Sequence, residues 1–276
     1  MGRPKERQEA NAFVIEGVRL IEEAVVSGWK FQFALYSDGL SERGKDLINI
    51  LIAHRINIEE VSGDLLQKAS ETETPQGILA VLEFAQLGIP TSPNFILIPD
   101  QIRDPGNLGT LLRTAAATGV QAVLLPPETT DPFAPKAVRA GMGAHFRLPI
   151  HSMTWEEIRE YVGSSHLTQQ DKSHRNDPSS QIEKTQPSGT TNPHLQVHLA
   201  DMNGTSCWET DLRQPLALVI GSEAVGASDE ARKLATQKIC IPMAGDVESL
   251  NAGVAGSVLM FEVVRQRRNI NNLVGE

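Results

Sequence analysis

Three short loops carry the residues whose types and spacing could do chemistry. They are DQIRDPGN (100–107), GSEAVGAS (221–228) and IPMAGDVESLN (241–251), and each follows an apolar run typical of a buried strand. In an open parallel sheet, ligands bind in the loops at the carboxyl ends of the strands. Because each loop combines small residues with polar ones, the three together predict a ligand site at one edge of a sheet.

These loops do not match the common phosphate-binding fingerprints. The chain contains neither G-x-G-x-x-G nor G-x-x-x-x-G-K-[ST], so a Rossmann dinucleotide site and a P-loop both lack a sequence basis. Gly141 and Gly143 begin such a pattern, but Phe146 stands where the third glycine would be. The two cysteines, Cys207 and Cys240, have no metal-ligand spacing. No metal site is predicted.

The segment DPGNLGTLLRTAAATG (104–119) predicts an amphipathic helix that carries one arginine. We expect Asn107 to be its N-cap. Gly109 lies one turn before Arg113, and a glycine there leaves the arginine room to reach a ligand beside the helix. The helix alone leaves two interpretations open, because Arg113 is either a solvated surface residue or a side chain that faces a reaction. The expected buried stripe consists of Leu108, Leu111, Leu112 and Ala115.

The elements that must position these loops alternate between strand and helix. Apolar strands that alternate with helices predict an α/β domain with a mainly parallel sheet, covered on both faces. We expect this domain to occupy residues 95–276. The strand patterns cover 95–100, 121–127, 215–223 and 238–243, and the helical patterns cover 108–119 and 250–268.

A smaller α/β unit is expected over residues 1–86. The segment 87–94 contains two prolines and no periodicity, and it is predicted to be a linker. Residues 164–193 are polar and poor in large apolar side chains, which predicts a disordered insertion. In the small unit, helical patterns cover 16–28 and 41–55, and strand patterns cover 31–38, 56–62 and 77–85.

Composition and charge limit the class of protein. The chain has 276 residues, 40% of them hydrophobic, with no apolar run long enough to span a membrane and no secretory signal pattern, so we expect a cytoplasmic protein. A net charge of −9 argues against a nucleic-acid-binding domain. The charge is uneven, however, because residues 105–127 and 132–155 contain no Asp or Glu. Their basic residues include Arg113, Lys136, Arg139 and Arg147.

The last helical pattern is unusually slim at its start. Small residues there suit close packing against another backbone or another subunit, and Ser249 is expected to cap the helix. Near its end, the arginines are expected to be solvated charges that complement the helix dipole. The small residues are Ala252, Gly253, Ala255, Gly256 and Ser257, and the arginines are Arg265, Arg267 and Arg268.

Taken jointly, the three loops resemble the motifs of the SpoU (TrmH-type) family of RNA ribose 2′-O-methyltransferases, in the SPOUT superfamily. DQIRDPGNLGTLLRTAAATG resembles the first motif, LALVIGSEAVGAS the second and IPMAGDVESLNAGVAGSVL the third. Their order and spacing agree over about residues 95–268. The segment FVIEGVRLIEEAV (13–25) is similar to the small RNA-substrate-binding domain that often precedes this catalytic domain.

The resemblance implies a fold, a cofactor and an assembly. The fold would be an α/β sheet whose carboxyl-terminal chain threads a trefoil knot, a rare exception to unknotted topology. The methyl donor would be S-adenosylmethionine, and the family works as a homodimer packed through the knot region. The residues implied to bind the cofactor are Gly221, Ile241, Met243, Leu250 and Asn251.

The resemblance also assigns catalytic roles, to Arg113, Asn107, Glu223, Ser249 and Asn251. A guanidinium stays protonated in proteins and is a poor base. We therefore expect Arg113 to orient the ribose and an adjacent RNA phosphate, while Asn107 holds Arg113 or the ribose. Glu223 either accepts the proton or only fixes its loop. The cations expected to bind RNA are Arg103, Lys136, Arg139 and Arg147.

Alternatives remain for both the target and the activity. Two-domain members with such a leading unit more often modify ribosomal RNA, so rRNA is favoured over tRNA. A catalytically silent RNA-binding protein on the same scaffold is the main rival. It has no chemical need for Asn107, Arg113, Glu223, Ser249 and Asn251 together. An unrelated nucleotide-binding enzyme would need a phosphate fingerprint that the sequence lacks.

Overall fold

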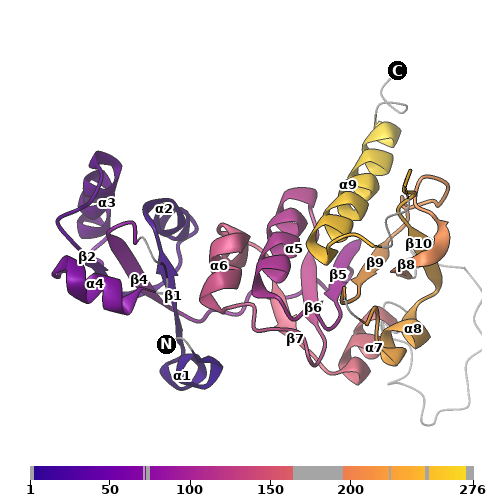
Figure 1. Cartoon of the computed structure of the whole chain (residues 1–276), viewed down its shortest axis with the longest axis horizontal. Helices are drawn as coiled ribbons and strands as arrows, with labels where there is room; N and C mark the ends of the chain where they lie inside the picture. The colour runs from indigo at the N-terminus through magenta and orange to yellow at the C-terminus, as the bar shows by residue number, and fades with distance from the viewer. Residues whose placement is uncertain are drawn as a thin grey trace, which may run out of the picture.

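The computed structural model describes residues 3–70, 72, 75–163, 195–223, 225–245 and 249–271. Over these residues the chain forms two α/β units, seen at the two ends of Figure 1. The predicted disordered insertion at 164–193 lies outside the described residues. No helix in the described part of the chain is both long and apolar enough to span a membrane.

The amino-terminal unit is a four-stranded mixed sheet in the order β1-β4-β2-β3. β4 pairs antiparallel with both β1 and β2, while β2 and β3 are parallel. Its strands are β1 (Ala12–Glu16), β2 (Phe31–Tyr36), β3 (Ile58–Glu60) and β4 (Ile78–Glu83). Its helices are α1 (Pro4–Ala10), α2 (Val18–Val26), α3 (Glu42–Ala53) and α4 (Gly63–Ala69).

The second unit is a six-stranded sheet in the order β10-β8-β9-β5-β6-β7, and every strand pair in it is parallel. The predicted α/β class is therefore confirmed; the trefoil knot stays a prediction. The strands are β5 (Phe95–Pro99), β6 (Ala122–Leu125), β7 (Ile150–Ser152), β8 (Gln196–Ser206), β9 (Leu216–Ile220) and β10 (Gln237–Cys240). The helices are α5 (Pro105–Thr118), α6 (Pro135–Gly141), α7 (Trp155–Gly163), α8 (Asp229–Leu234) and α9 (Ala252–Asn271), with a 3-10 turn at Ala144–Phe146.

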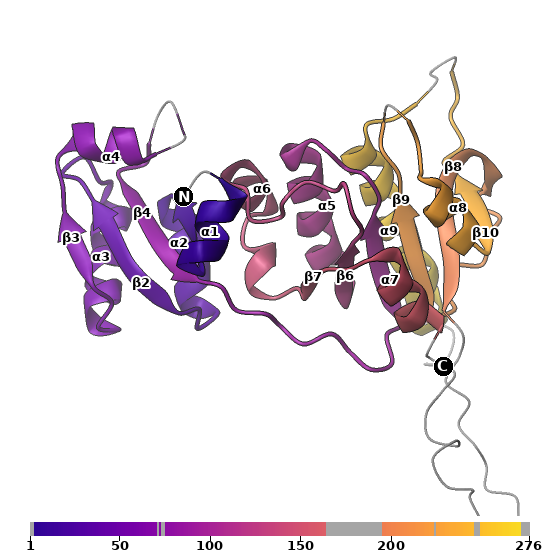
Figure 2. The same ribbon diagram turned by 90° about the horizontal axis from the view of Figure 1, so that it is seen from below.

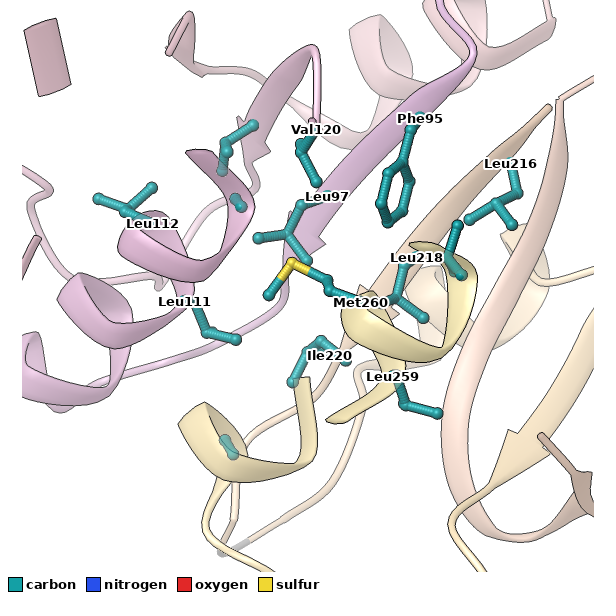
Figure 3. Packing of buried hydrophobic residues seen from close by; sticks show 14 of the residues in the cluster. Phe95, Leu97, Leu111, Leu112, Val120, Leu216, Leu218, Ile220, Leu259 and Met260 are labelled. Carbon is teal, nitrogen blue, oxygen red and sulfur yellow. The ribbon is translucent and has the colours of Figure 1, made fainter. Parts of the chain in front are cut away.

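Both faces of this parallel sheet are covered, which explains why its central strands are apolar throughout. On one face, Leu97 and Leu218 pack against α5 and α9, with Leu111 and Met260 at the centre of the cluster (Figure 3). On the other face, strand residues such as Ile98 pack against α7 and α8. The α5–α9 face matters for function, because both helices begin at the same edge of the sheet.

The two units are joined by side-chain contacts as well as by the connecting chain. The segment 84–94 contains no helix or strand and runs along one side of the molecule (Figure 2). The Trp29 and Phe146 rings lie 5.3 Å apart, and the Phe13 and Phe133 rings 5.0 Å apart. Two ion pairs, Arg7–Asp131 and Arg147–Glu23, also connect the units.

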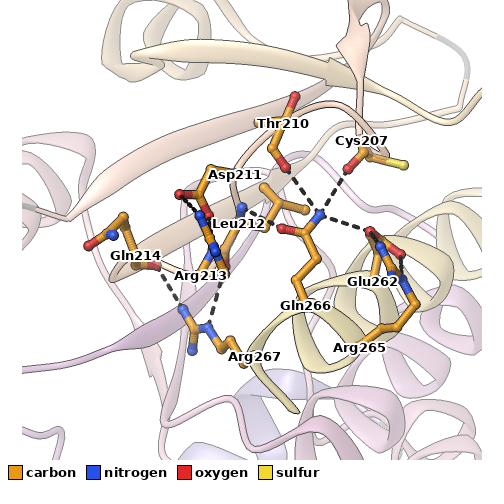
Figure 4. Close-up of polar contacts among 10 residues, drawn as sticks. All are labelled: Cys207, Thr210, Asp211, Leu212, Arg213, Gln214, Glu262, Arg265, Gln266 and Arg267. Atoms are coloured by element: carbon orange, nitrogen blue, oxygen red, sulfur yellow. Dashed lines mark hydrogen bonds and ion pairs between the residues drawn. The ribbon is translucent and has the colours of Figure 1, made fainter. Parts of the chain in front are cut away.

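The far end of α9 is tied to the chain between β8 and β9, as Figure 4 shows. Gln266 donates to the carbonyls of Cys207 (3.2 Å) and Thr210 (3.1 Å) and accepts from the Leu212 amide (2.9 Å). Arg267 lies over the Phe95 ring at 5.1 Å. It also donates to the carbonyls of Leu212, Gln214 and Asn94. The expectation that Arg267 is a solvated charge is wrong, because its half-buried guanidinium donates to three backbone carbonyls.

Candidate functional site

The three polar loops meet at one hydrogen-bonded cluster. The Asn107 amide donates to the carboxylate of Glu223, and Asn251 Nδ2 donates to Asn107 Oδ1 at 2.9 Å. The backbone N–H of Ala252, at the start of α9, donates to Glu223 Oε1 at 3.2 Å. Residues more than a hundred positions apart therefore converge on a single carboxylate.

Local capping frees the Asn107 side chain for this cluster. Asp104 is the N-cap of α5, since its Oδ1 accepts from the Asn107 backbone N–H at 2.9 Å and Pro105 follows it. The expectation that Asn107 is the N-cap is wrong, because Asp104 already satisfies that N–H. On α9, Asn251 accepts from Val254 N at 3.2 Å, so Asn251 makes the capping bond expected of Ser249.

Gly109 has a packing role that the sequence did not predict. It is buried, and a Cβ at this position would lie 2.5 Å from both the Ala137 carbonyl oxygen and the Ala140 Cβ. The missing side chain therefore lets α6 pack against α5. That it also leaves Arg113 room to reach a ligand stays a prediction.

A cavity of about 680 Å³ opens beside the cluster. Its floor is apolar, formed by Ile220, Ile239 and Leu259, and its size falls within the range of about 300–1,000 Å³ that small-molecule sites occupy. At Gly221 a Cβ would lie 2.7 Å from the backbone of Gly226 and Ala227, so only glycine allows the loop to fold back there. The predicted site residues among its lining are Gly221, Glu223, Ile241, Met243, Ser249 and Leu250.

Arg113 lies outside this cavity. It is exposed on α5 and makes no hydrogen bond or ion pair with any residue that the structure describes. At about 100° per residue, Arg113 lies roughly 120° around the helix from Asn107. Within one chain, the structure therefore brings Asn107, Glu223 and Asn251 together but leaves Arg113 apart.

Three of the four cations expected to bind RNA already have a carboxylate partner. Arg103 pairs with Glu128 at 3.0 Å, Lys136 with Asp104 at 2.8 Å, and Arg147 with Glu23. Arg139 is half-buried on α6. Exposed ion pairs of this kind contribute about 0–1 kcal/mol, so a phosphate group can compete for the cations. Their RNA-binding role stays a prediction.

Sequence reasoning missed two charged residues that line the cavity. Asp201 lies in the middle of β8 and Arg232 lies on α8, and the two form an ion pair at 3.4 Å. Neither element was predicted, because LQVHLADMNG (195–204) mixes polar and apolar residues and α8 has only six residues. A pair 31 positions apart carries no local signal.

A buried carboxylate holds the second loop in place. Asp100 is fully buried directly after β5, and its Oδ2 accepts from the Ser228 N–H at 2.6 Å. Burial raises the pKa of Asp100, and the hydrogen bonds from Ser228 partly oppose that shift. The bond closes the loop 221–228 that carries Gly221 and Glu223.

Comparison with known proteins identifies the family. Residues 94–261 match the model of the SpoU rRNA Methylase family, which covers more than half of the chain. The chain belongs to the SpoU rRNA methylase family. Residues 1–80 match a model described as an MRM3-like substrate binding domain. The resemblance of the three motifs, and the class of RNA methyltransferase that it implied, are confirmed.

Relatives and solved structures agree with this membership. The 23S rRNA (guanosine(2553)-2′-O)-methyltransferase RlmP of Bacillus subtilis is 31% identical, with 94% of this chain and 91% of the relative aligned. The 23S rRNA (uridine(2479)-2′-O)-methyltransferase of Streptomyces viridochromogenes is 30% identical, over 97% of this chain and 87% of the relative. The SpoU methyltransferase AviRb of that organism, solved with the cofactor AdoMet, aligns with a TM-score of 0.77 and 26% identity, over 97% and 95% of the two chains.

Proposed function

We propose that this protein transfers a methyl group from S-adenosylmethionine to a ribose 2′-hydroxyl of ribosomal RNA. The observation that carries the proposal is the Asn107–Glu223–Asn251 cluster at the edge of a nucleoside-sized cavity. The cavity fits the cofactor in size, in its apolar floor and in its polar rim. Gly221, Ile241, Met243 and Leu250 would hold the cofactor, which supplies an electrophilic methyl group.

Within the cluster, Glu223 is engaged as an acceptor. It receives hydrogen bonds from Asn107 and from the Ala252 N–H at the positive end of α9. This favours a positioning role, in which Glu223 fixes Asn107 and Asn251 at the mouth of the cavity. Asn107 then orients the ribose, and the proton leaves through a phosphate oxygen or water. Ser249 is exposed at the rim, where it can contact the RNA.

Because Arg113 does not line the cavity of its own chain, it could act at the cavity of a second subunit. Three apolar side chains on α9 are exposed on one face, Val254 (48%), Val258 (39%) and Phe261 (55%), at spacings of four and three residues. Arg113 lies next to Thr114, whose hydroxyl contacts Ser257 on α9 at 2.9 Å. We propose that this α5–α9 face forms a homodimer, in which Arg113 serves the partner's cavity.

A charged residue introduced on the α5–α9 face tests the proposed dimer. Phe261→Glu should convert the protein to monomers, because the new carboxylate would be buried unpaired in the interface. Light scattering measures the mass, and methylation should fall in parallel. A variant that stays dimeric through another face, or a wild-type protein that is monomeric at working concentration, would refute the proposed arrangement.

The substrate proposal favours rRNA over tRNA. Two relatives named as 23S rRNA 2′-O-methyltransferases align along nearly the whole chain, including the amino-terminal unit. The two cysteines are free thiols, in keeping with the reducing cytoplasm where we propose that the protein acts.

The deciding experiment maps 2′-O-methyl sites in total RNA from cells with and without the gene. We expect one rRNA position to lose its methyl group, and to regain it with the wild-type gene but not with Arg113→Ala. The purified variant should bind S-adenosylmethionine within about twofold of wild type, since Arg113 does not line the cavity of its own chain and is proposed to contact the ribose and phosphate of the RNA, not the cofactor. Loss of a methyl group from a tRNA instead would identify tRNA as the substrate and refute the rRNA proposal. Cofactor binding without any lost RNA site would support a silent scaffold.

A further inference from the structure

The cofactor cavity is also lined by charged residues that lie outside the three motifs in the sequence. Of the described residues that line it, the charged ones are Asp201, Glu223 and Arg232. Glu223 belongs to the cluster with Asn107 and Asn251. Asp201 and Arg232 come from β8 and α8, which carry none of the motifs. They need a separate explanation.

Asp201 is held in one orientation from three sides. Its Oδ1 accepts from Asn203 N at 3.0 Å, and its Oδ2 accepts from Lys238 Nζ at 2.9 Å and from Arg232 Nη1 at 3.4 Å. Arg232 in turn donates from Nε to the Ala227 carbonyl at 3.2 Å. The Asp201 side chain is 12% exposed. A carboxylate fixed in this way is preorganised as an acceptor.

One acceptor position remains open on this carboxylate. A carboxylate has about four lone-pair sites. Oδ2 receives two hydrogen bonds and Oδ1 receives one from the described residues, so Oδ1 can accept one more. The Asn203 N–H and the Lys238 ammonium lower the pKa of Asp201, which keeps it ionised as an acceptor.

The charges around Asp201 limit what the donor can be. Lys238 and Arg232 both contact Oδ2 and together outweigh the single negative charge of Asp201. A cationic ammonium group would be repelled by this surplus, whereas a neutral hydroxyl would not. The adenine ring suits the apolar floor at Ile220, Ile239 and Leu259. The ribose of the cofactor offers the neutral hydroxyl donors.

We propose that Asp201 accepts a hydrogen bond from a ribose hydroxyl of the bound adenosyl cofactor, and that Arg232 and Lys238 are positioning residues for it. The inference rests on the proposed function, because it assumes that this cavity holds S-adenosylmethionine. It assigns a specificity-determining role to a residue outside the three motifs. It requires that the enzyme distinguish the cofactor from analogues that lack one ribose hydroxyl.

Calorimetric titration of the full-length protein tests the contact. The ligands are S-adenosylhomocysteine and its 2′-deoxy and 3′-deoxy analogues. For wild type, we expect one deoxy analogue to bind about tenfold more weakly or worse, as for a lost hydrogen bond to a charged group. In Asp201→Ala, S-adenosylhomocysteine should weaken to a similar extent, and the ratio between it and that analogue should approach one.

Two further variants separate contact from folding. Asp201→Asn keeps an oxygen for the Asn203 N–H but loses the charge, so its ratio should lie between those of wild type and Asp201→Ala. Asp211→Ala also removes an ion-paired aspartate, the partner of Arg213, but Asp211 does not line the cavity and the ratio should stay at the wild-type value. Thermal melting should show that all four proteins are folded at the titration temperature.

The outcomes distinguish this inference from the proposed function. If wild type binds S-adenosylhomocysteine but the ratio is the same in wild type and in Asp201→Ala, the ribose contact is refuted and the cofactor assignment stands. A further ligand is an analogue that lacks the adenine amino group. If wild type binds this analogue more weakly than S-adenosylhomocysteine, if Asp201→Ala abolishes that difference, and if neither deoxy analogue behaves in this way, the ribose contact is also refuted. If wild type binds none of these ligands, both proposals fail.

Discussion

The two ends of α9 use polar side chains in opposite ways. At the amino-terminal end, Asn251 and the Ala252 N–H join Asn107 and Glu223 in a half-exposed cluster beside a cavity. At the carboxyl-terminal end, Gln266 makes hydrogen bonds through both its amide nitrogen and its oxygen, all to groups of the protein. The first cluster is exposed enough to make further hydrogen bonds to a substrate, whereas the side-chain groups of Gln266 are already bonded within the fold. The two ends of α9 therefore have different roles, one at the candidate site and one in stability.

The largest expected effect comes from breaking the cluster at the cavity. Asn107→Ala should lower kcat by about 100-fold or more, as expected when a group that aligns the reacting hydroxyl is lost. The free energy of unfolding should change by less than about 1 kcal/mol, because water can reach the Glu223 and Asn251 groups left behind. Single-turnover methylation and urea unfolding measure the two quantities.

Asn57→Ala is the matched control for that variant, since Asn57 is an exposed asparagine of the amino-terminal unit. It should change neither quantity. An Asn107→Ala protein that methylates at the wild-type rate would remove the cluster from the mechanism. One that unfolds several kcal/mol more easily would make the cluster structural, like the other end of α9.

The sequence could place the cavity because the predicted lining residues lie in loops that follow strands of a parallel sheet. Gly221 comes directly after the buried strand β9, Ile241 comes directly after β10, and Leu250 lies further along the segment that follows β10. The carboxyl ends of parallel strands share an edge. The side-chain partners could not be placed in the same way. Asp104 and Asn107 are both good N-caps by type, and only the structure shows that Asp104 makes the bond.

The missed residues share a physical reason. Arg267 looks like a solvated charge on a helix, yet it satisfies carbonyls of a connection more than fifty residues away. Asp201 and Arg232 meet only because β8 lies between β9 and β10, an order that no local pattern encodes. Propensity predicts elements and their loops, whereas long-range polar pairs depend on topology.

The second prediction concerns a variant that removes the hydrogen bonds at the carboxyl-terminal end of α9. Gln266→Ala should lower the free energy of unfolding by about 2–3 kcal/mol, because the Leu212 N–H and two carbonyls lose their partner in a half-buried place. The kcat per folded molecule should stay within about twofold of wild type, since Gln266 is remote from the cavity lining. Urea unfolding and active-site titration measure both.

Gln8→Ala, at an exposed position on α1, is the control for losing a helical glutamine and should be nearly neutral. If Gln266→Ala kept full stability but lost activity, the contrast between the two ends of α9 would be wrong. The carboxyl-terminal end of α9 would then influence the geometry of the catalytic site rather than stabilise the fold.

The smallest expected effect concerns His145, a fully buried side chain whose protonated form would carry a second ring N–H with no described acceptor. His145 Nε2 donates to the Pro132 carbonyl at 2.7 Å, while Nδ1 is buried and has no hydrogen-bond partner among the described residues. Burial lowers the pKa of His145 to about 4. The unfolded chain, with a pKa of about 6.5, binds the proton more readily, so His145 favours folding above pH 6.5 and loses that contribution as the pH falls toward 4. Between pH 7 and pH 5 the loss should be about 2 kcal/mol.

His145→Gln removes the titration but keeps a donor for the Pro132 carbonyl. Chemical unfolding of both proteins at pH 7, 6 and 5 isolates the histidine, because all other groups titrate equally in the two. The difference in unfolding free energy should shrink by about 2 kcal/mol from pH 7 to pH 5. A constant difference would mean that the pKa of His145 is the same in the folded and unfolded protein, so that the folded protein accommodates the imidazolium with a partner for Nδ1. His145 would then resemble the cluster at the cavity, where polar groups can form further hydrogen bonds. It would differ from the anchored end of α9, where the polar groups of Gln266 are already bonded.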